Sequence, residues 1–103
     1  MSAENLAEQA AVITCLTGLA VGHPNLPAAY VTISRHAPRE LHVQLDSPSK
    51  VEAWREALGV DAALLVVDRI GDRPSLEFDA TAFGIDFHVY TTYQPATVEA
   101  GAA

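Results

Sequence analysis

Apolar residues recur every three or four positions between residues 3 and 20, which predicts an amphipathic helix near the N-terminus. The predicted buried stripe consists of Leu6, Ala10, Ile13, Leu16 and Ala20. Ser2 is the expected N-cap, and Gly22, followed by His23 and Pro24, is expected to end the helix.

Strict alternation of apolar and polar residues follows over residues 29–33 and again over residues 41–45. Alternation with a period of two is typical of half-buried strands. A turn containing His36, Ala37 and Pro38 separates the two segments. We therefore expect an antiparallel hairpin.

A second helix is predicted over residues 48–58, because Ser47 and a first-turn proline supply start signals. Ser49 and Glu52 form an alternative capping box. Gly59 stands where a left-handed C-cap is expected. The predicted buried face of this helix is Val51, Trp54 and Leu58.

Residues 62–67 form an unbroken apolar run, which predicts a central strand covered on both faces. Turn residues at 71–72 and 82–84 then bound two alternating segments, 76–80 and 85–90. The element order is α-β-β-α-β-β-β. It predicts an α+β fold, with one sheet of about five strands and both helices packed on a single face. We expect a single domain over residues 1–93 and a flexible tail over residues 94–103.

The formal net charge of −7 alters the range of expected functions. Phosphate backbones and anionic lipids repel such a chain, so we expect neither direct nucleic-acid binding nor membrane binding. Simple solubility explains the acidity. A sharper interpretation is an acidic inhibitor that mimics nucleic acid on a basic partner.

Cys15 is the single cysteine, and it has no second cysteine with which to form an intramolecular disulfide. A reducing compartment, the cytoplasm, is therefore expected. The apolar run at residues 10–21 falls short of the roughly 20 residues that span a bilayer. Glu4 and Glu8 precede it without a lysine or arginine, opposite to a secretory signal.

If the helices cover one sheet face, the other face collects the polar strand residues. These are Tyr30, Thr32, Ser34, His42, Gln44, Asp46, Glu77, Asp79, Asp86, His88 and Tyr90. The candidate interaction face is Tyr30, Thr32, His42, Gln44, Asp79, Asp86, His88 and Tyr90. Tyrosines are enriched at protein interfaces, which favours a homodimer or an unidentified protein partner.

The same face offers a different chemistry. His42 and His88, with a carboxylate from Asp79 or Asp86, are residue types that bind metals or transfer protons. No metal-ligand spacing supports this, and the distance between the two histidines depends on strand order, so no metal and no cofactor are predicted.

Other sequence signals for chemistry are weak. Arg35 and Arg39 flank the first hairpin turn, and Arg69 and Arg73 flank a later one, each a candidate anion site. A strand–helix–strand crossover places these two turns at opposite ends of the sheet. There is no nucleophile elbow and no glycine-rich phosphate loop, so we expect a protein that is not an enzyme.

The segments HPNLPAAYVTIS, PRELHVQLDS, VEAWREALGV and LEFDATAFGIDFHVY resemble small actinobacterial proteins of the Streptomyces type. Many of these lie near phage-like or integrative elements. The resemblance implies an accessory or regulatory role and brings no known activity or catalytic residues. The leading expectation is a non-catalytic interaction module. The alternatives are the acidic inhibitor and a small ligand- or metal-binding domain that uses the His42 and His88 face.

Overall fold

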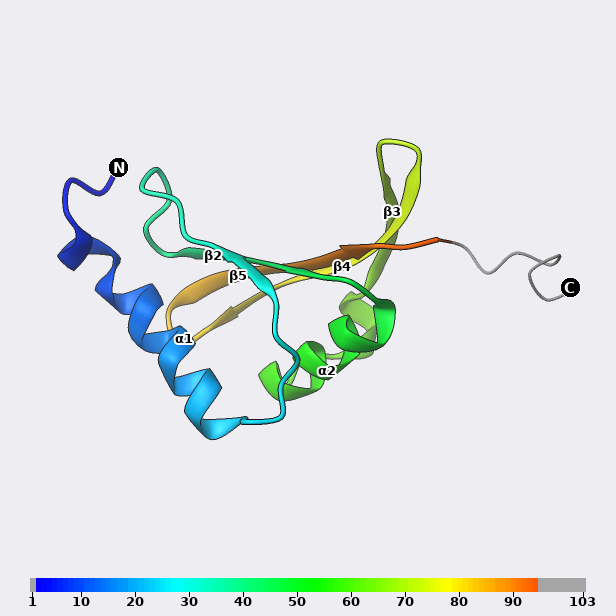
Figure 1. The fold of residues 1–103 in the computed structure, drawn as a ribbon, viewed down its shortest axis with the longest axis horizontal. Helices are drawn as coiled ribbons and strands as arrows, with labels where there is room; N and C mark the ends of the chain where they lie inside the picture. Colours follow the sequence, from blue (N-terminus) through cyan, green and yellow to red (C-terminus); the bar gives the residue numbers. More distant parts are fainter. Residues whose placement is uncertain (1, 95–103) are drawn as a thin grey trace, which may run out of the picture.

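The computed structural model describes residues 2–94, and their helices and strands follow the predicted order (Figure 1). A 3-10 helix, η1 (Leu6–Gln9), leads into α1 (Ala10–Gly22), and α2 (Pro48–Leu58) follows the second strand. A second 3-10 helix, η2 (Ala62–Leu64), precedes the third strand. The strands are β1 (Tyr30–Thr32), β2 (Glu40–Leu45), β3 (Val66–Ile70), β4 (Arg73–Ala82) and β5 (Ile85–Thr92).

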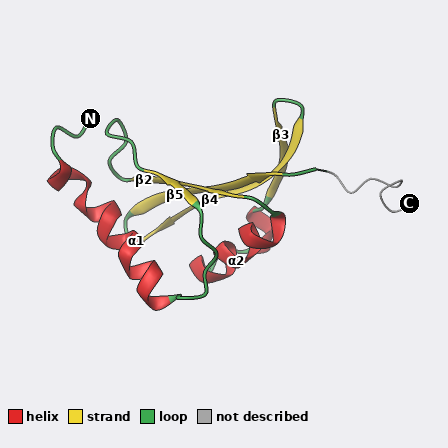
Figure 2. Cartoon of the chain, in the orientation of Figure 1, coloured by secondary structure: helices red, strands yellow, loops and turns green. Residues whose placement is uncertain are grey.

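The five strands form one mixed sheet in the order β1-β2-β5-β4-β3. β2 and β5 are parallel, and every other neighbouring pair is antiparallel. Both helices lie against the same side of the sheet (Figure 2). The predicted α+β fold, with two helices on one face of a five-stranded sheet, is confirmed.

The core lies between this sheet face and the two helices. It consists of Val12, Leu19, Leu41, Val43, Leu45, Val51, Trp54, Phe78, Ile85, Phe87 and Val89. Trp54 fixes the chain that leaves α1, because its indole Nε1–H donates to the carbonyl oxygen of Pro27 at 2.9 Å. The strands that supply most of the core, β2 and β5, stand side by side in the middle of the sheet.

The N-terminal helix differs from the prediction at its start and in its buried face. Asn5, and not Ser2, caps the first turn, since its side-chain oxygen accepts from the Glu8 amide at 3.2 Å. Leu6, predicted to be buried, is 70% exposed. The residues that face the core are Val12, Cys15, Leu16 and Leu19. Because α1 contains no charged residue, its sequence does not specify which side faces the sheet.

The end of α1 at Gly22 is confirmed, as are both ends of α2. A proline occupies the first turn of α2, and Gly59 adopts the left-handed conformation at φ 69°. Ser47 stands at the N-cap position without a side-chain capping hydrogen bond. Its hydroxyl lies 3.2 Å from that of Ser49 instead. The alternative capping box is not formed, because the Glu52 carboxylate binds Arg55 at 2.9 Å.

The prediction of a central strand at residues 62–67 is wrong. Residues 62–64 form η2, and β3 is an edge strand whose five residues are all exposed. Figure 1 shows the β3–β4 hairpin projecting away from both helices. Asp61 caps η2, because its side-chain oxygen accepts a hydrogen bond from the Ala63 amide at 2.9 Å. This local hydrogen bond competes with strand formation at the start of the apolar run.

The tail predicted at residues 94–103 lies, apart from Gln94, outside the described residues. Within residues 2–94, no helix is long and apolar enough to cross a bilayer.

Candidate functional site

The sheet face opposite the helices is polar, and no described helix covers it. In β2 and β5 every second residue is buried toward the helices, and the residues between them point the other way. The strand register extends this alternation across β1 and β4. This open face carries all eight residues of the predicted interaction face: Tyr30, Thr32, His42, Gln44, Asp79, Asp86, His88 and Tyr90.

Strand register assembles these residues into cross-strand rows. One row contains Thr32, His42, His88 and Asp79. The next row contains Tyr30, Gln44, Tyr90 and Glu77. Within the first row, the rings of His42 and His88 are neighbours, with centroids 5.5 Å apart. The sequence left this distance open because it did not specify that β5 pairs with β2.

Both histidines are held by carboxylates. The Nδ1 atom of His88 lies 2.6 Å from Oδ1 of Asp79, and its Nε2 lies 3.8 Å from Oε1 of Glu77. The Nε2 atom of His42 lies 3.3 Å from Oε1 of Glu40. The ring of His88 is also 5.2 Å from that of Tyr90. The centre of the open face is therefore an ordered cluster of imidazoles, carboxylates and one phenol.

A like-charged pair stands at one end of this cluster. Glu40 of β2 and Asp86 of β5 are direct register partners, and both are exposed. Like charges placed opposite each other destabilise a sheet. Asp86 accepts one hydrogen bond from Thr81 at 2.7 Å. Glu40 was not among the predicted face residues, although the alternation of His42 and Gln44 extends back to it.

Cations are scarce around the open face. β1, β2 and β5 contain no lysine or arginine, and the one arginine of β4, Arg73, is its first residue. Lys50 lies at the sheet margin, 2.8 Å from Asp46. Its hydrogen bond, and then its charge, hold the pKa of the Asp46 carboxyl below its usual value. The guanidinium of Arg39 lies beside the β4–β5 turn, 3.8 Å from where a Cβ of Gly84 would stand.

The cluster contains a histidine–carboxylate pair, His88 and Asp79. Nδ1 of His88 is within hydrogen-bond distance of Asp79, whereas Nε2, 3.8 Å from Glu77, is beyond it. Among residues 2–94, Ser2 Oγ lies 3.3 Å from His36 Nδ1, and both residues are exposed. In the part of the chain that the structure describes, no three His, Cys, Asp or Glu side chains are grouped to hold a metal ion.

The remaining sequence candidates, Ser34 and the two arginine-flanked turns, lie apart from the centre of the open face. Ser34 is in the turn after β1, where its hydroxyl accepts from the His36 amide at 3.0 Å. The two arginine-flanked turns lie at opposite ends of the sheet, as predicted (Figure 1). At the second turn, Arg69 donates to the carbonyl oxygen of Asp72 at 2.7 Å, which closes the hairpin.

The outer edge of β3 is also exposed. The sequence did not predict this edge, because its unbroken apolar run favoured a central strand there. Val66, Val67 and Ile70 are all exposed, and Val67 is 70% exposed. An edge strand presents unpaired backbone groups, and proteins usually protect such strands with lysine, proline or a bulge. β3 contains no lysine or proline, and its two charged residues are Asp68 and Arg69.

No protein family, curated protein or solved structure matches this chain.

Proposed function

We propose that this protein is a non-catalytic interaction module whose open sheet face binds a positively charged surface of a partner protein. The observation that carries the proposal is the charge of that face. Glu40, Glu77, Asp79 and Asp86 surround two histidines and two tyrosines, and no lysine or arginine stands among them. A basic partner would relieve the repulsion between Glu40 and Asp86.

The aromatic residues support a protein partner over free counter-ions. The side chain of Tyr30 is 78% exposed at the first edge of the sheet, and Tyr90 lies in the middle of the same row. Tyrosine offers an apolar ring for burial and a hydroxyl for hydrogen bonding, and arginine stacks well on such rings. The proposal places the module in the cytoplasm, since a lone cysteine suits a reducing compartment.

We propose that the module also forms a homodimer. Charge repulsion favours the edge of β3 over the open face as the surface through which two copies pair. Two copies pairing by their open faces would bring the same carboxylates together. Antiparallel pairing of two β3 edges about Asp68 would instead place Val66 against Ile70 of the second copy. Only Asp68 would then meet a like charge. Such a homodimer would leave both acidic faces free for a basic partner.

The acidic inhibitor of a nucleic-acid-binding protein is a second candidate for the same face. It requires carboxylates gathered on one surface, and Glu77, Asp79 and Asp86 share the open face. The two candidates differ in the site that they occupy on the partner. An acidic inhibitor would occupy the partner's nucleic-acid site, so nucleic acid would displace it.

The experiment uses a fluorescein-labelled peptide of six Lys-Gly repeats, with binding followed by anisotropy at low and high salt. We expect salt-sensitive binding, because exposed charges are screened within about 10 Å at 0.1 M salt. Neutralising the face with Glu77→Gln, Asp79→Asn and Asp86→Asn together should weaken binding about tenfold, equivalent to about 1.4 kcal/mol.

The matched control carries Glu8→Gln, Glu56→Gln and Asp72→Asn, which changes the net charge equally away from the open face. Its affinity should change less than about twofold. Equal losses in the two triple variants would show that net charge alone binds the peptide, and the proposal would fail. For a natural partner, displacement by a duplex oligonucleotide would select the inhibitor.

A further inference from the structure

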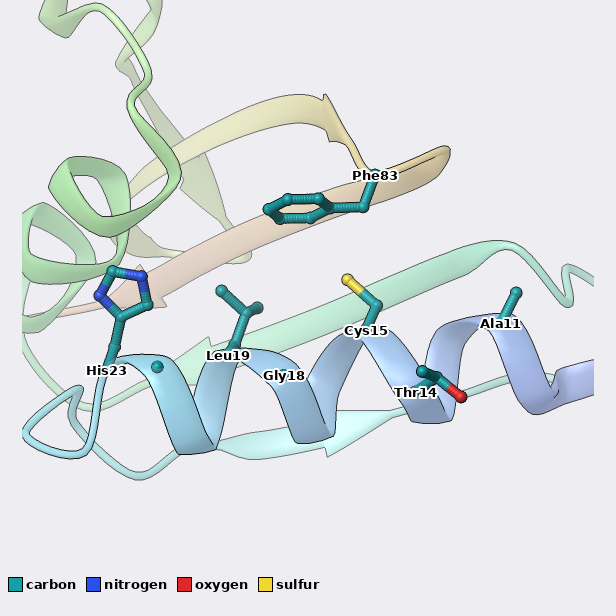
Figure 3. Close-up of a pocket in the computed structure, with 8 residues that line it drawn as sticks. Ala11, Thr14, Cys15, Gly18, Leu19, His23 and Phe83 are labelled. Atoms are coloured by element: carbon teal, nitrogen blue, oxygen red, sulfur yellow. The ribbon is translucent and has the colours of Figure 1, made fainter.

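A groove on the helix side of the sheet lies outside the proposed interaction face. One wall is α1, which contributes Ala11, Thr14, Cys15, Gly18, Leu19 and Gly22, with His23 at its end. The other wall is Phe83, in the turn between β4 and β5 (Figure 3). The groove has a volume of about 410 Å³, within the roughly 300–1,000 Å³ typical of small-molecule sites.

Phe83 is an unusual residue for its position. It forms a two-residue hairpin turn with Gly84, and both have positive φ, 57° and 75°. Such turns favour asparagine or aspartate followed by glycine, because a bulky residue is strained at positive φ. The Phe83 side chain is 77% exposed, so core packing does not compensate for the strain. Its ring instead extends along the groove opposite α1 (Figure 3).

Gly18 is a second locally unfavourable choice, on the facing wall. Glycine inside a helix is less favourable than alanine, because it loses more backbone freedom on folding. Nothing lies within 4 Å of a Cβ built at Gly18, so no close approach of another segment requires glycine there. A larger side chain would project into the open space of the groove. Two residues that each weaken their own element thus keep the same groove open and line it with an aromatic ring.

The lining indicates the chemical class of the occupant. It contains no carboxylate, lysine or arginine, so a charged ligand would lose its hydration without gaining a counter-charge. The thiol of Cys15 and the side chains of Leu19 and Phe83 offer apolar contact. The imidazole of His23 stands at one end as a hydrogen-bonding group.

We propose that this groove binds a small neutral apolar molecule, with its ring or chain between α1 and Phe83 and a hydrogen-bonding group toward His23. The site is independent of the acidic face, because the helices and the open face lie on opposite sides of the sheet. A second copy or a partner helix seated in the groove would be a different occupant, and the experiment distinguishes them.

The probe is N-phenyl-1-naphthylamine, a neutral apolar fluorophore, titrated into the full-length protein. We expect saturable binding that Gly18→Leu weakens at least tenfold by filling the groove. Phe83→Asn should weaken binding about tenfold while raising or preserving the melting temperature, because asparagine suits the turn. A merely structural role for Phe83 predicts the opposite change in melting temperature. Bound probe should also slow alkylation of Cys15 by iodoacetamide.

The control is Val67→Asn, which removes an apolar side chain of similar exposure on β3. It should leave probe affinity unchanged. Equal affinity in wild type, Gly18→Leu and Phe83→Asn, or an equal loss in Val67→Asn, would overturn the assignment. Sedimentation velocity supplies the remaining test: a wild-type dimer that Gly18→Leu converts to monomer would show that a second copy occupies the groove.

Discussion

The thiol of Cys15 shows how a single residue takes its properties from its surroundings. It lies on the half-buried side of α1, against the core and beside the groove. Burial raises the pKa of this thiol above its ordinary value, because the thiolate loses hydration. The groove lining contains no lysine or arginine that could offset that loss, and His23 stands at the end of the groove. The residue is therefore a packing residue and not an activated nucleophile.

This predicts slow alkylation of Cys15 by iodoacetamide near neutral pH. The thiolate is the reactive form, so the rate should rise with pH to a midpoint above the roughly 8.5 of a free cysteine. The same thiol in urea-unfolded protein is the control and should react with an ordinary midpoint. A midpoint in the folded protein below that of the unfolded chain would contradict this account of Cys15.

Individual side chains of the open face were predictable where alternation was strict. The period of two in β2 and β5 specified that His42, His88 and Tyr90 point away from the buried side of their own strands. That period is a property of one strand and carries no information about neighbours. The contact of His88 with Asp79 and the adjacency of His42 depend on pairing between strands that are far apart in sequence.

At the scale of elements, two glycines make opposite contributions. Gly59 ends α2 at φ 69°, a conformation in which other residues are strained. Gly18 stands in the interior of α1 with open space around the position of a Cβ. The first glycine therefore stabilises its helix end, and the second weakens its helix.

We expect Gly59→Ala to lower the free energy of unfolding by about 1 kcal/mol, because alanine is strained in the left-handed region. Gly18→Ala should raise it by up to about 1 kcal/mol through helix propensity. Urea denaturation followed by circular dichroism measures both, with an unchanged m-value confirming a native-state comparison. Two changes of the same sign would contradict the assigned roles.

Elements were predictable where residues of distinct chemistry bounded them, and less so where the chain is uniformly apolar. Gly22 and Gly59 mark helix ends that the structure confirms. Residues 62–67 are all apolar, so the run shows no alternation that would distinguish a buried strand from an exposed edge strand. β3 lies at the sheet edge because β5 inserts between β2 and β4. This strand order depends on contacts throughout the fold and not on the sequence of the run itself.

At the scale of the whole molecule, the sheet separates two kinds of surface. The helix side buries the core and carries the groove beside Phe83, and the open side collects carboxylates, histidines and tyrosines. The net charge of −7 is thus partly concentrated on one face. A field of this kind speeds the approach of a basic partner and orients it before contact.

The proposed binding surface can be located by mapping peptide binding on the folded protein. Amide chemical shifts of the ¹⁵N-labelled chain are recorded during titration with the peptide of six Lys-Gly repeats. We predict that the largest changes fall on the open face, at Thr32, His42, Gln44, His88 and Tyr90. Residues of α1 and α2 should change little. Changes centred on the helices, or spread evenly over the chain, would contradict the proposal that the open sheet face is the binding surface.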